Sequence, residues 1–475
     1  MLAACIVAYL VAMIAVGIVA SRRVHGAADY AVARGRFGTA VVGATVFATW
    51  FGAETVLGIP AVFMKEGVGG LAADPFAAVG CLVLVALVFA RPLFRLHGLT
   101  LGDFFRDRFD RRCEMLLSAC IAFSYLGWVA AQLVALGVVF ATLTGGAMDV
   151  RTGAVAGAAI VLVYTLWGGM WSVALTDFVQ AIVIVLGLAC VAWMMAGLAG
   201  GADRVIASAV SAGRLRFAAP TDLRGLLALA SASFIVLLGS VPQQDVLQRI
   251  RSARTEGVAV AGTLLGAAAY FVIACVPMFL VSAAALIDPP LVRRLLEGDS
   301  QMILPTLVLE RMPVAVQALF FGALLSAIFS TASAALLAPA VTVAGNLVRP
   351  LLRDSGDRTL LRAMRLTVLL LAVVVTAMAV LSQQSIYDLV NNSGKVVLAA
   401  AFVPLAAGLF WRGATARGAW WSAVGGLATW VGCEVLAPQA TLPPALAGLL
   451  ASGLGMVAGS FRDPAGVASP MRERP

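Results

Sequence analysis

The sequence predicts an all-α polytopic membrane protein. Of its 475 residues, 61% are hydrophobic and only 12% are charged, whereas soluble proteins are about 45–50% apolar and about 25% charged. The mean hydropathy is +0.98, and the apolar residues form long continuous runs, not the short alternating segments of a membrane β-barrel. These observations exclude a water-soluble enzyme and a disordered chain. They leave room for about a dozen helices of roughly 20 residues each.

Thirteen apolar segments are long enough to cross a bilayer as helices. They are residues 2–20, 39–64, 72–90, 113–143, 153–170, 172–199, 225–247, 257–285, 314–347, 361–381, 385–410, 418–437 and 441–461. The first segment has no basic region before it, and Arg22 and Arg23 follow it. A cleaved signal peptide has the reverse order, so we expect the first helix to be retained.

The basic residues predict the orientation, because cytoplasmic loops of membrane proteins are enriched in Lys and Arg. With the N-terminus outside, 23 of the 33 Lys and Arg lie in cytoplasmic segments and nine lie outside. Those cytoplasmic segments are residues 21–38, 91–112, 248–256, 348–365, 411–418 and the tail from residue 462. The net charge of +9 then reports topology, and no nucleic-acid-binding motif accompanies it. We expect a multi-pass protein of the plasma (bacterial inner) membrane with a cytoplasmic C-terminus.

Two of the predicted spans contain residues that interrupt helices. They are Gly43, Gly52, Gly58 and Pro60 in segment 39–64, and Gly239, Ser240 and Pro242, followed by Gln243 and Gln244, in segment 225–247. Each interrupted span opens a block of five spans, and paired interruptions of this kind are typical of transporters built from inverted repeats. The chain would divide into a leading helix and cytoplasmic loop (1–38), repeat one (39–199), an external loop (200–224), repeat two (225–410), two peripheral helices (411–461) and a cytoplasmic tail (462–475).

Ionisable side chains inside a span are costly, so each needs a partner or a function. Glu54 lies mid-span beside a predicted interruption, where contact with a solute and a hydrogen bond to freed backbone amides are equally compatible with the sequence. Asp177 lies early in the sixth span, where a structural acid complementing the helix dipole is also possible. Lys395 lies near mid-depth, which favours a buried partner or an anionic ligand. Asp74 is interpreted as an interfacial cap, and Glu434 as structural.

The ninth span carries hydroxyl groups on one helical face. Ala327 and Ser330 are three residues apart, and Thr331 is adjacent. Such residues usually serve helix packing. Here they also suit a hard monovalent cation, provided that a broken helix supplies carbonyl oxygens from the other side. The seven cysteines show no CxxC spacing, only two histidines are present, and no P-loop, GxSxG or HExxH motif has its required context, so nothing indicates an enzyme.

In this order and on thirteen spans, four groups of residues resemble the sodium:solute symporter family, which includes bacterial proline and sugar symporters and the choline transporters. The groups are Tyr164-Thr165-x-x-Gly168-Gly169-x-x-Ser172-Val173-x-x-Thr176-Asp177-x-x-Gln180, Phe51-Gly52-Ala53-Glu54-x-x-x-Gly58, Ala327-x-x-Ser330-Thr331, and Pro404-x-x-x-Gly408-Leu409-Phe410-Trp411 with Gly418-Ala419. The resemblance covers nearly the whole chain. It implies a LeuT-like core of two inverted five-helix repeats, with one leading and two trailing helices.

The resemblance also implies one sodium site between the second and ninth spans. Its ligands would be the carbonyl oxygens of Ala48, Phe51 and Ala327 and the hydroxyls of Ser330 and Thr331. Asp177 matches an aspartate that supports sodium binding or release in the family. Some members hold a second sodium with an acid shortly after the Ser/Thr pair, but residues 332–334 here contain none. We therefore expect one sodium per cycle.

The solute site is expected between the interrupted spans and the eleventh span. Its candidate residues are Trp50, Glu54, Tyr125, Trp128, Gly239, Ser240, Gln243 and Lys395. In sugar-transporting relatives an acid–amide pair lies on the first interrupted helix, whereas here Glu54 matches the acid and Thr55 replaces the amide. The second interrupted span offers Val236, Gly239 and Ser240, which have little hydrogen-bonding capacity for a sugar, and this argues against one. Lys395 could hold a carboxylate, or together with Glu54 a zwitterion, whereas the aromatic residues could cage a quaternary amine or simply pack between helices. We expect a small carboxylate or an amino-acid-like solute.

These inferences predict a sodium-coupled secondary active symporter that imports a small organic solute by alternating access. Its partners would be the solute, sodium and the lipid bilayer, with no nucleic acid and no obligatory protein partner. Three alternatives remain: a transporter of the same fold coupled to protons through Glu54, Asp177 or Lys395, a transporter-like membrane sensor, and a membrane-embedded enzyme.

Overall fold

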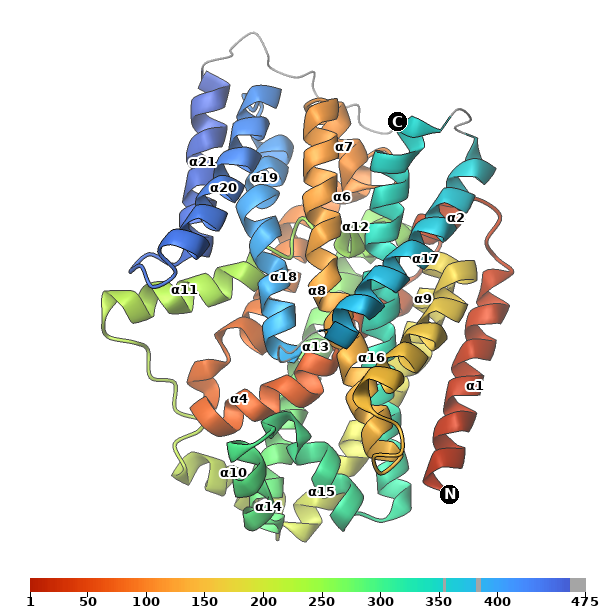
Figure 1. Ribbon diagram of the computed structural model, residues 1–475, viewed down its shortest axis with the longest axis vertical. Helices are drawn as coiled ribbons and strands as arrows, with labels where there is room; N and C mark the ends of the chain where they lie inside the picture. Colours follow the sequence, from red (N-terminus) through yellow and green to blue (C-terminus); the bar gives the residue numbers. More distant parts are fainter. Residues whose placement is uncertain (353–355, 382–385, 462–475) are drawn as a thin grey trace.

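The computed structural model describes residues 1–352, 356–381 and 386–461, and within these ranges the chain forms helices and no β-strand. Figure 1 shows most of the helices running along the long axis of the molecule, as expected for a bundle that crosses a membrane. The N-terminus and the end of the last helix lie at opposite ends of this axis.

Long apolar helices alternate along the chain with shorter ones. In the first half the helices are α1 (Leu2–Ser21), α2 (Ala27–Val32), α3 (Thr39–Trp50), α4 (Ile59–Glu66), α5 (Ala78–Leu84), α6 (Ala90–Arg95), α7 (Leu101–Arg108), α8 (Arg111–Leu143), α9 (Val150–Leu198) and α10 (Ala202–Ser211). In the second half they are α11 (Leu223–Leu237), α12 (Gln244–Ser252), α13 (Glu256–Ile287), α14 (Pro289–Glu297), α15 (Ile303–Arg311), α16 (Val314–Thr342), α17 (Asp357–Leu381), α18 (Ile386–Ala400), α19 (Phe402–Phe410), α20 (Ala416–Leu436) and α21 (Pro444–Phe461). Single π-helical turns extend some of them, namely η2 (Glu54–Gly58) before α4, η4 (Ala72–Ala77) before α5, η5 (Val85–Phe89) before α6 and η7 (Val343–Val348) after α16.

Eight helices in the described residues are long and apolar enough to cross a membrane, or up to ten if each of two bent pairs forms one span. The predicted class, an all-helical multi-pass membrane protein, is therefore confirmed. Helix α9 has 49 residues, about 74 Å at 1.5 Å per residue, which is too long for one crossing of a hydrocarbon layer about 30 Å thick. It kinks at Gly169, where φ is +48°, close to the predicted boundary between segments 153–170 and 172–199.

The first interruption lies at Phe51 and Gly52, where α3 ends and the direction of the span changes by 55° before η2 and α4 continue it. The second separates α11 from α12, where residues 238–242 form turns and Gln243 is extended. Helix α12 extends beyond the predicted end of the seventh span at residue 247. Residues 248–252, the first part of the segment expected to be cytoplasmic, are therefore helical. Arg249 and Arg251 in that segment are buried within the protein.

Other differences concern short helices and a further bend. The eleventh span bends by 42° between α18 and α19. Segments predicted as loops contain α2, α7, α10, α14 and α15. Local capping explains two of these short helices: Thr100 and Asp103 form a reciprocal capping box at the start of α7, and Asp288 caps α14 ahead of Pro289.

Helix α16 lies at the centre of the bundle and packs against α9, α8 and α3. Every residue from Phe320 to Thr342 is buried, so this helix is surrounded by protein along most of its length. Helices α20 and α21 pack mainly on each other at one side of the molecule (Figure 1). The polar side chains of α16 therefore face other helices and not lipid, as polar groups at membrane depth require.

Candidate functional site

The first interruption faces α16 through an arrangement that we name the oxygen cluster: the carbonyl oxygens of Ala48, Thr49 and Ala327 and the hydroxyls of Ser330 and Thr331. Ser330 Oγ donates to Ala48 O at 2.7 Å and to Ala327 O at 2.9 Å. Thr331 Oγ1 lies 2.9 Å from Thr49 O and 3.4 Å from Ala48 O. All five residues are buried. Because α3 ends at residue 50, its last carbonyls lack the following helical turn and accept hydrogen bonds from α16 instead.

Four of the five predicted sodium ligands thus lie together, namely Ala48, Ala327, Ser330 and Thr331. Phe51 lies in the interruption itself and is fully buried. Its amide bonds back to Phe47. Five uncharged hard oxygens at a helix interruption are the donor set that suits a monovalent alkali cation.

Asp177 of α9 reaches the same part of α3. Its Oδ2 accepts hydrogen bonds from the hydroxyls of Thr45 and Thr49, and the residue is fully buried. Its Oδ1 has no hydrogen-bond partner in the described part of the chain. Asp177 therefore contacts the oxygen cluster through Thr49 and does not cap its own helix.

Arg249 of α12 connects this region to a second buried acid. It is 2% exposed, and it donates to Thr49 Oγ1 and, at 3.3 Å, to Thr45 O. Its Nη1 lies 2.8 Å from Asp245 O and 3.7 Å from Asp245 Oδ2. Asp245 in turn accepts a hydrogen bond from the hydroxyl of Tyr125 on α8.

A cavity lies between the two interrupted spans, α8, α13 and α18. Its lining residues are Trp50, Glu54, Asp74, Ala78, Trp128, Ile235, Val236, Ser240, Gln243, Tyr270, Val390, Ser393 and Gly394. The lining contains two carboxylates and three aromatic side chains. No Lys, Arg or His belongs to this described lining.

The two cavity carboxylates are held by neighbouring side chains. Gln132 Nε2 donates to Glu54 Oε2 at 2.8 Å, and Trp128 Nε1 lies 3.4 Å from Glu54 Oε1. The hydroxyl of Tyr270 donates to Asp74 Oδ1. These contacts fix both acids at the cavity wall. The interpretation of Asp74 as an interfacial cap is therefore wrong, because it is 9% exposed and lies beside the cavity.

The structure separates the predicted solute residues into two groups. Those that line the cavity are Trp50, Glu54, Trp128, Ser240 and Gln243, and those that do not are Tyr125, Gly239 and Lys395. Tyr125 lies behind Trp128, with stacked rings whose centroids are 6.0 Å apart. Gly239 packs closely on the backbone of Gly394 in α18.

Lys395 faces away from the cavity. Its Nζ lies 3.2 Å from Glu434 Oε1 on α20, and both side chains are partly exposed. The physical reason is helical periodicity: Val390, Ser393 and Gly394 share the face that lines the cavity, and the next residue is rotated by about 100°. A buried partner or an anionic ligand is the expectation for Lys395, whereas its partner in the structure, Glu434, has an exposed side chain.

Sequence reasoning missed five residues of this region: Asp74, Gln132, Tyr270, Asp245 and Arg249. Asp74 gave a usable signal, because it is an acid within an apolar segment. Asp245 and Arg249 lie four apart, which is a helical ion-pair spacing. Tyr270 and Gln132 gave none, because their roles depend on partners distant in sequence.

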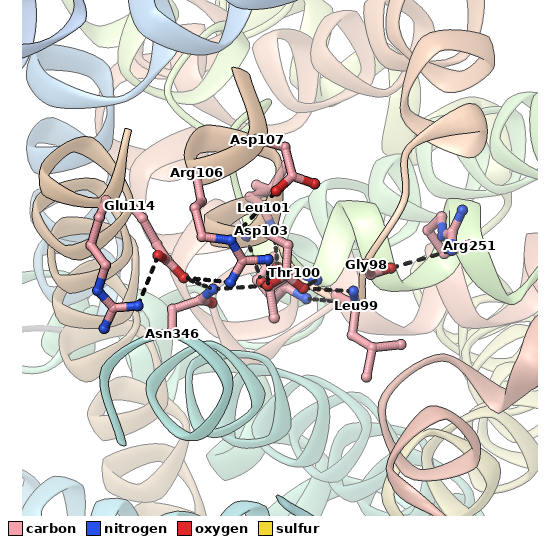
Figure 2. A network of polar contacts seen from close by, with 12 residues as sticks. Gly98, Leu99, Thr100, Leu101, Asp103, Arg106, Asp107, Glu114, Arg251 and Asn346 are labelled. Atoms are coloured by element: carbon pink, nitrogen blue, oxygen red, sulfur yellow. Dashed lines mark hydrogen bonds and ion pairs between the residues drawn. The ribbon is translucent and has the colours of Figure 1, made fainter. Parts of the chain in front are cut away.

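Figure 2 shows a separate polar network around the N-terminus of α7. Thr100 and Asp103 cap the helix reciprocally, with a 3.0 Å bond from Asp103 N to Thr100 Oγ1. Asn346 of η7 donates to Asp103 at 3.3 Å and to Glu114 of α8 at 2.8 Å. Arg251 of α12 donates to a carbonyl of the α6–α7 loop at 3.2 Å. The network fixes this loop against α8, η7 and α12.

The longest sequence motif, residues 164–180, holds α9 to its neighbours. The hydroxyl of Tyr164 donates to Phe329 O of α16 at 3.0 Å. Ser172 Oγ donates to Gly17 O of α1 at 2.6 Å. The kink at Gly169 allows close contact with Tyr30, whose carbonyl would lie 2.5 Å from an added Cβ.

Comparison with known proteins agrees with this geometry. The model of the sodium:solute symporter family matches residues 30–426. The human high affinity choline transporter 1 is 28% identical over 407 residues, which are 82% of this chain and 68% of that protein. Its Drosophila melanogaster counterpart is 27% identical, and the match covers 76% of this chain but 58% of the fly protein. The high-affinity proline transporter PutP of Bacillus subtilis is 25% identical, with 88% and 89% covered.

Solved structures share the fold. A Na+-coupled sialic acid symporter in a substrate-bound outward-open state superposes with a TM-score of 0.83 at 19% identity, and 99% of each chain is covered. A nucleobase-cation-symport-1 family transporter gives a TM-score of 0.61 at 16% identity, with 93% and 96% covered. The chain belongs to the sodium:solute symporter family, and its coupling ion is sodium.

Proposed function

We propose that this protein imports a small organic ammonium compound together with sodium, by alternating access. The observation that carries the solute class is the cavity lining: Glu54 and Asp74 supply negative charge, and Trp50, Trp128 and Tyr270 supply aromatic surface. Aromatic faces attract alkylammonium groups, and nearby carboxylates add charge attraction. The names of the choline transporters among the relatives agree with such a solute.

This proposal replaces the expected carboxylate solute. A carboxylate in the cavity would lie near two acids without a basic residue in the described lining, and like charges in a desolvated site repel strongly. Lys395, the residue on which the carboxylate expectation rested, faces Glu434. An amino-acid-like solute would find partners for its ammonium end only.

We also propose that one sodium ion binds in the oxygen cluster, with Asp177 in support. Rotation of the Ser330 and Thr331 hydroxyls would turn their lone pairs toward the ion and free the carbonyls of Ala48 and Thr49. The carbonyl of Phe51 would complete the set. Import of one sodium with one cationic solute would move two positive charges, each gaining about 2.3 kcal/mol at 100 mV.

We further propose the topology predicted from the sequence. Thirteen spans result if α9 counts as two, each interrupted or bent span counts as one, and α20 is a crossing helix. Repeat one is 39–199 and repeat two is 225–410, flanked by residues 1–38 and 411–461. The N-terminus would lie outside and the C-terminus in the cytoplasm, and this proposal is supported by the positions of the N-terminus and the end of α21 at opposite ends of the molecule (Figure 1).

The test is binding to the purified full-length chain. We expect choline to raise the unfolding midpoint in sodium but much less in potassium, because a ligand of the native state stabilises it. Acetate, proline and sialic acid serve as carboxylate-bearing comparisons. Stabilisation by acetate and not by choline would overturn the proposed solute class.

Uptake into proteoliposomes tests the coupling. Choline accumulation driven by a sodium gradient is the expected result. Accumulation that persists without sodium and collapses with the pH gradient would instead select the proton-coupled alternative. Choline binding without any uptake would favour a sensor.

A further inference from the structure

Thr49 takes part both in the oxygen cluster and in the contacts of Arg249. Its carbonyl accepts from Thr331 Oγ1 at 2.9 Å within the oxygen cluster, and its hydroxyl accepts from the guanidinium of Arg249. Thr331 and Arg249 are both almost fully buried. Any displacement of Thr49 that accompanies ion binding therefore acts directly on Arg249.

The other side of Arg249 leads toward the cavity. The backbone oxygen of Asp245 accepts a hydrogen bond from Nη1 of Arg249, and its Oδ1 accepts one from the hydroxyl of Tyr125. The backbone amide of Asp245 in turn donates to the Tyr125 oxygen at 2.9 Å. The ring of Tyr125 stacks on Trp128, with an interplanar angle of 25°. Trp128 lines the cavity, where its Nε1 lies 3.4 Å from a Glu54 oxygen. The contacts are continuous from the oxygen cluster to the proposed solute site.

This chain of contacts contains more acidic than basic side chains. Asp177 and Asp245 are fully buried acids. Arg249 is the basic side chain that contacts Asp245 and the hydroxyl of Thr49, which in turn bonds Asp177. One oxygen of each acid, Asp177 Oδ1 and Asp245 Oδ2, has no hydrogen-bond partner in the described residues. Buried charge without a full set of partners is costly. With both acids ionised, a sodium ion in the oxygen cluster supplies the missing positive charge.

We infer that Arg249 is a positioning residue that couples sodium occupancy of the oxygen cluster to solute affinity in the cavity; this rests on the proposed function. A sodium ion at the cluster balances Asp177, so the guanidinium remains on Asp245. Asp245 then fixes the Tyr125 hydroxyl, and the stacked Tyr125 ring fixes Trp128 against Glu54. The cavity is thereby organised for solute when sodium is bound.

Coupling of this kind is reciprocal. If sodium raises the affinity for solute by some factor, solute must raise the affinity for sodium by the same factor. This coupling factor is the quantity that Arg249 controls. A residue with a purely structural role would change stability or both affinities without changing the factor.

The experiment uses the purified full-length chain with choline as the probe. Choline Kd is measured in sodium and in potassium, and the sodium concentration for half-maximal thermal stabilisation is measured with and without choline. Two variants interrupt the contacts, Arg249→Lys and Tyr125→Phe. Tyr125→Phe removes one hydroxyl and keeps the stacked ring, so it decides the question if Arg249→Lys does not fold. The matched control is Arg251→Gln, also on α12. The Arg251 guanidinium bonds the carbonyls of Leu96 and Gly98 in the α6–α7 loop, and Figure 2 shows the contact with Gly98.

We expect sodium to tighten choline binding in the wild type and in Arg251→Gln by the same factor. In Tyr125→Phe the factor should fall by about 2- to 30-fold, with sodium affinity in the absence of choline retained. An unchanged factor in both Tyr125→Phe and folded Arg249→Lys would overturn the inference while leaving the proposed function intact. A wild-type factor of one would overturn the proposed function and this inference with it.

Discussion

The backbone groups freed by the two helix interruptions find different hydrogen-bond partners. One interruption lies between α3 and η2, and the other lies between α11 and α12. At the first, the carbonyls of Ala48 and Thr49 accept hydroxyls from another helix, α16. At the second, the backbone from Leu238 to Val241 forms consecutive local turns, and the side chains of Ser240 and Gln243 face the cavity.

The difference separates the two ligands by chemistry. Freed carbonyls that meet hydroxyls make a compact set of uncharged oxygens, which suits a bare cation. A locally bonded turn leaves its side chains available and makes room for a larger organic solute. The first interrupted span thus supplies backbone oxygens to the oxygen cluster, and the second supplies side chains that line the cavity.

The largest effect is expected from the charge of the cavity. Glu54→Gln keeps the shape of the side chain but removes its charge, and we expect choline Kd to rise about 100-fold, because a desolvated charge partner is lost. Choline binding to the purified chain measures this, with Glu434→Gln as the control acid outside the cavity. Unchanged affinity in Glu54→Gln would show that the cavity does not hold a cation.

The next effect concerns the second interruption alone. In Gly239→Ala the new Cβ would lie 2.3 Å from Ile235 O and 2.9 Å from Gly394 O, so the backbone of α11 or α18 must move. We expect a loss of about 2 kcal/mol in the free energy of unfolding. Chemical unfolding measures it against Gly432→Ala, whose Cβ would meet nothing within 4 Å. Equal stability of the two variants would contradict the close packing.

A smaller effect should mark the first interruption. Ser330→Ala and Thr331→Val each remove one oxygen from the cluster, and we expect the sodium concentration for half-maximal uptake to rise about tenfold in each variant. Ser326→Ala is the control, because its hydroxyl lies on the same helix but bonds Tyr9 and Gly322 O. If sodium dependence stayed at its wild-type value in both variants, the ion would have to bind elsewhere.

The smallest effect lies outside both interruptions. The backbone N–H of Leu291 and the side chain of Arg311 hold the pKa of Asp288 below its usual value. Its contribution to stability is therefore present above the unfolded-state pKa, and it is lost as the pH falls through the lower folded-state pKa. Asp288→Asn should unfold at a lower temperature than wild type at pH 7, and the difference should shrink at about pH 3. Sodium and choline dependence should not change, and a change in either would show that the contact between Asp288 and Arg311 communicates with the site.

Much of the architecture followed from local pattern. Apolar runs located the helices that cross the membrane, and Gly52 and Gly239 located the two interruptions, because helix propensity and hydrophobicity are properties of neighbouring residues. The Ala327, Ser330 and Thr331 face followed from helical periodicity. Their predicted use as sodium ligands also needed the resemblance to a family.

The cavity was predicted less well, because its polar residues are paired across long separations. Tyr270 and Asp74 are 196 residues apart, and Gln132 and Glu54 are 78 apart. Arg249 was expected at the membrane surface, because it lies with Arg251 and Arg254 just after an apolar segment, and basic residues ordinarily flank a span. Asp245 lies only four residues before it and gave a local signal, but nothing local indicated its partners Thr45 and Thr49 on α3.

The sequence by itself determined the class of the protein, the positions of its two helix interruptions and the row of hydroxyls on α16. These features depend on hydrophobicity and backbone geometry within a few turns of helix. Only the tertiary structure decided that Asp74 lines the cavity together with Glu54 and that Lys395 contacts Glu434 outside the cavity. It also decided that Arg249 lies between two buried acids. The physical reason is that a charge at membrane depth is stabilised by whichever partners surround it, and those partners come from distant parts of the chain.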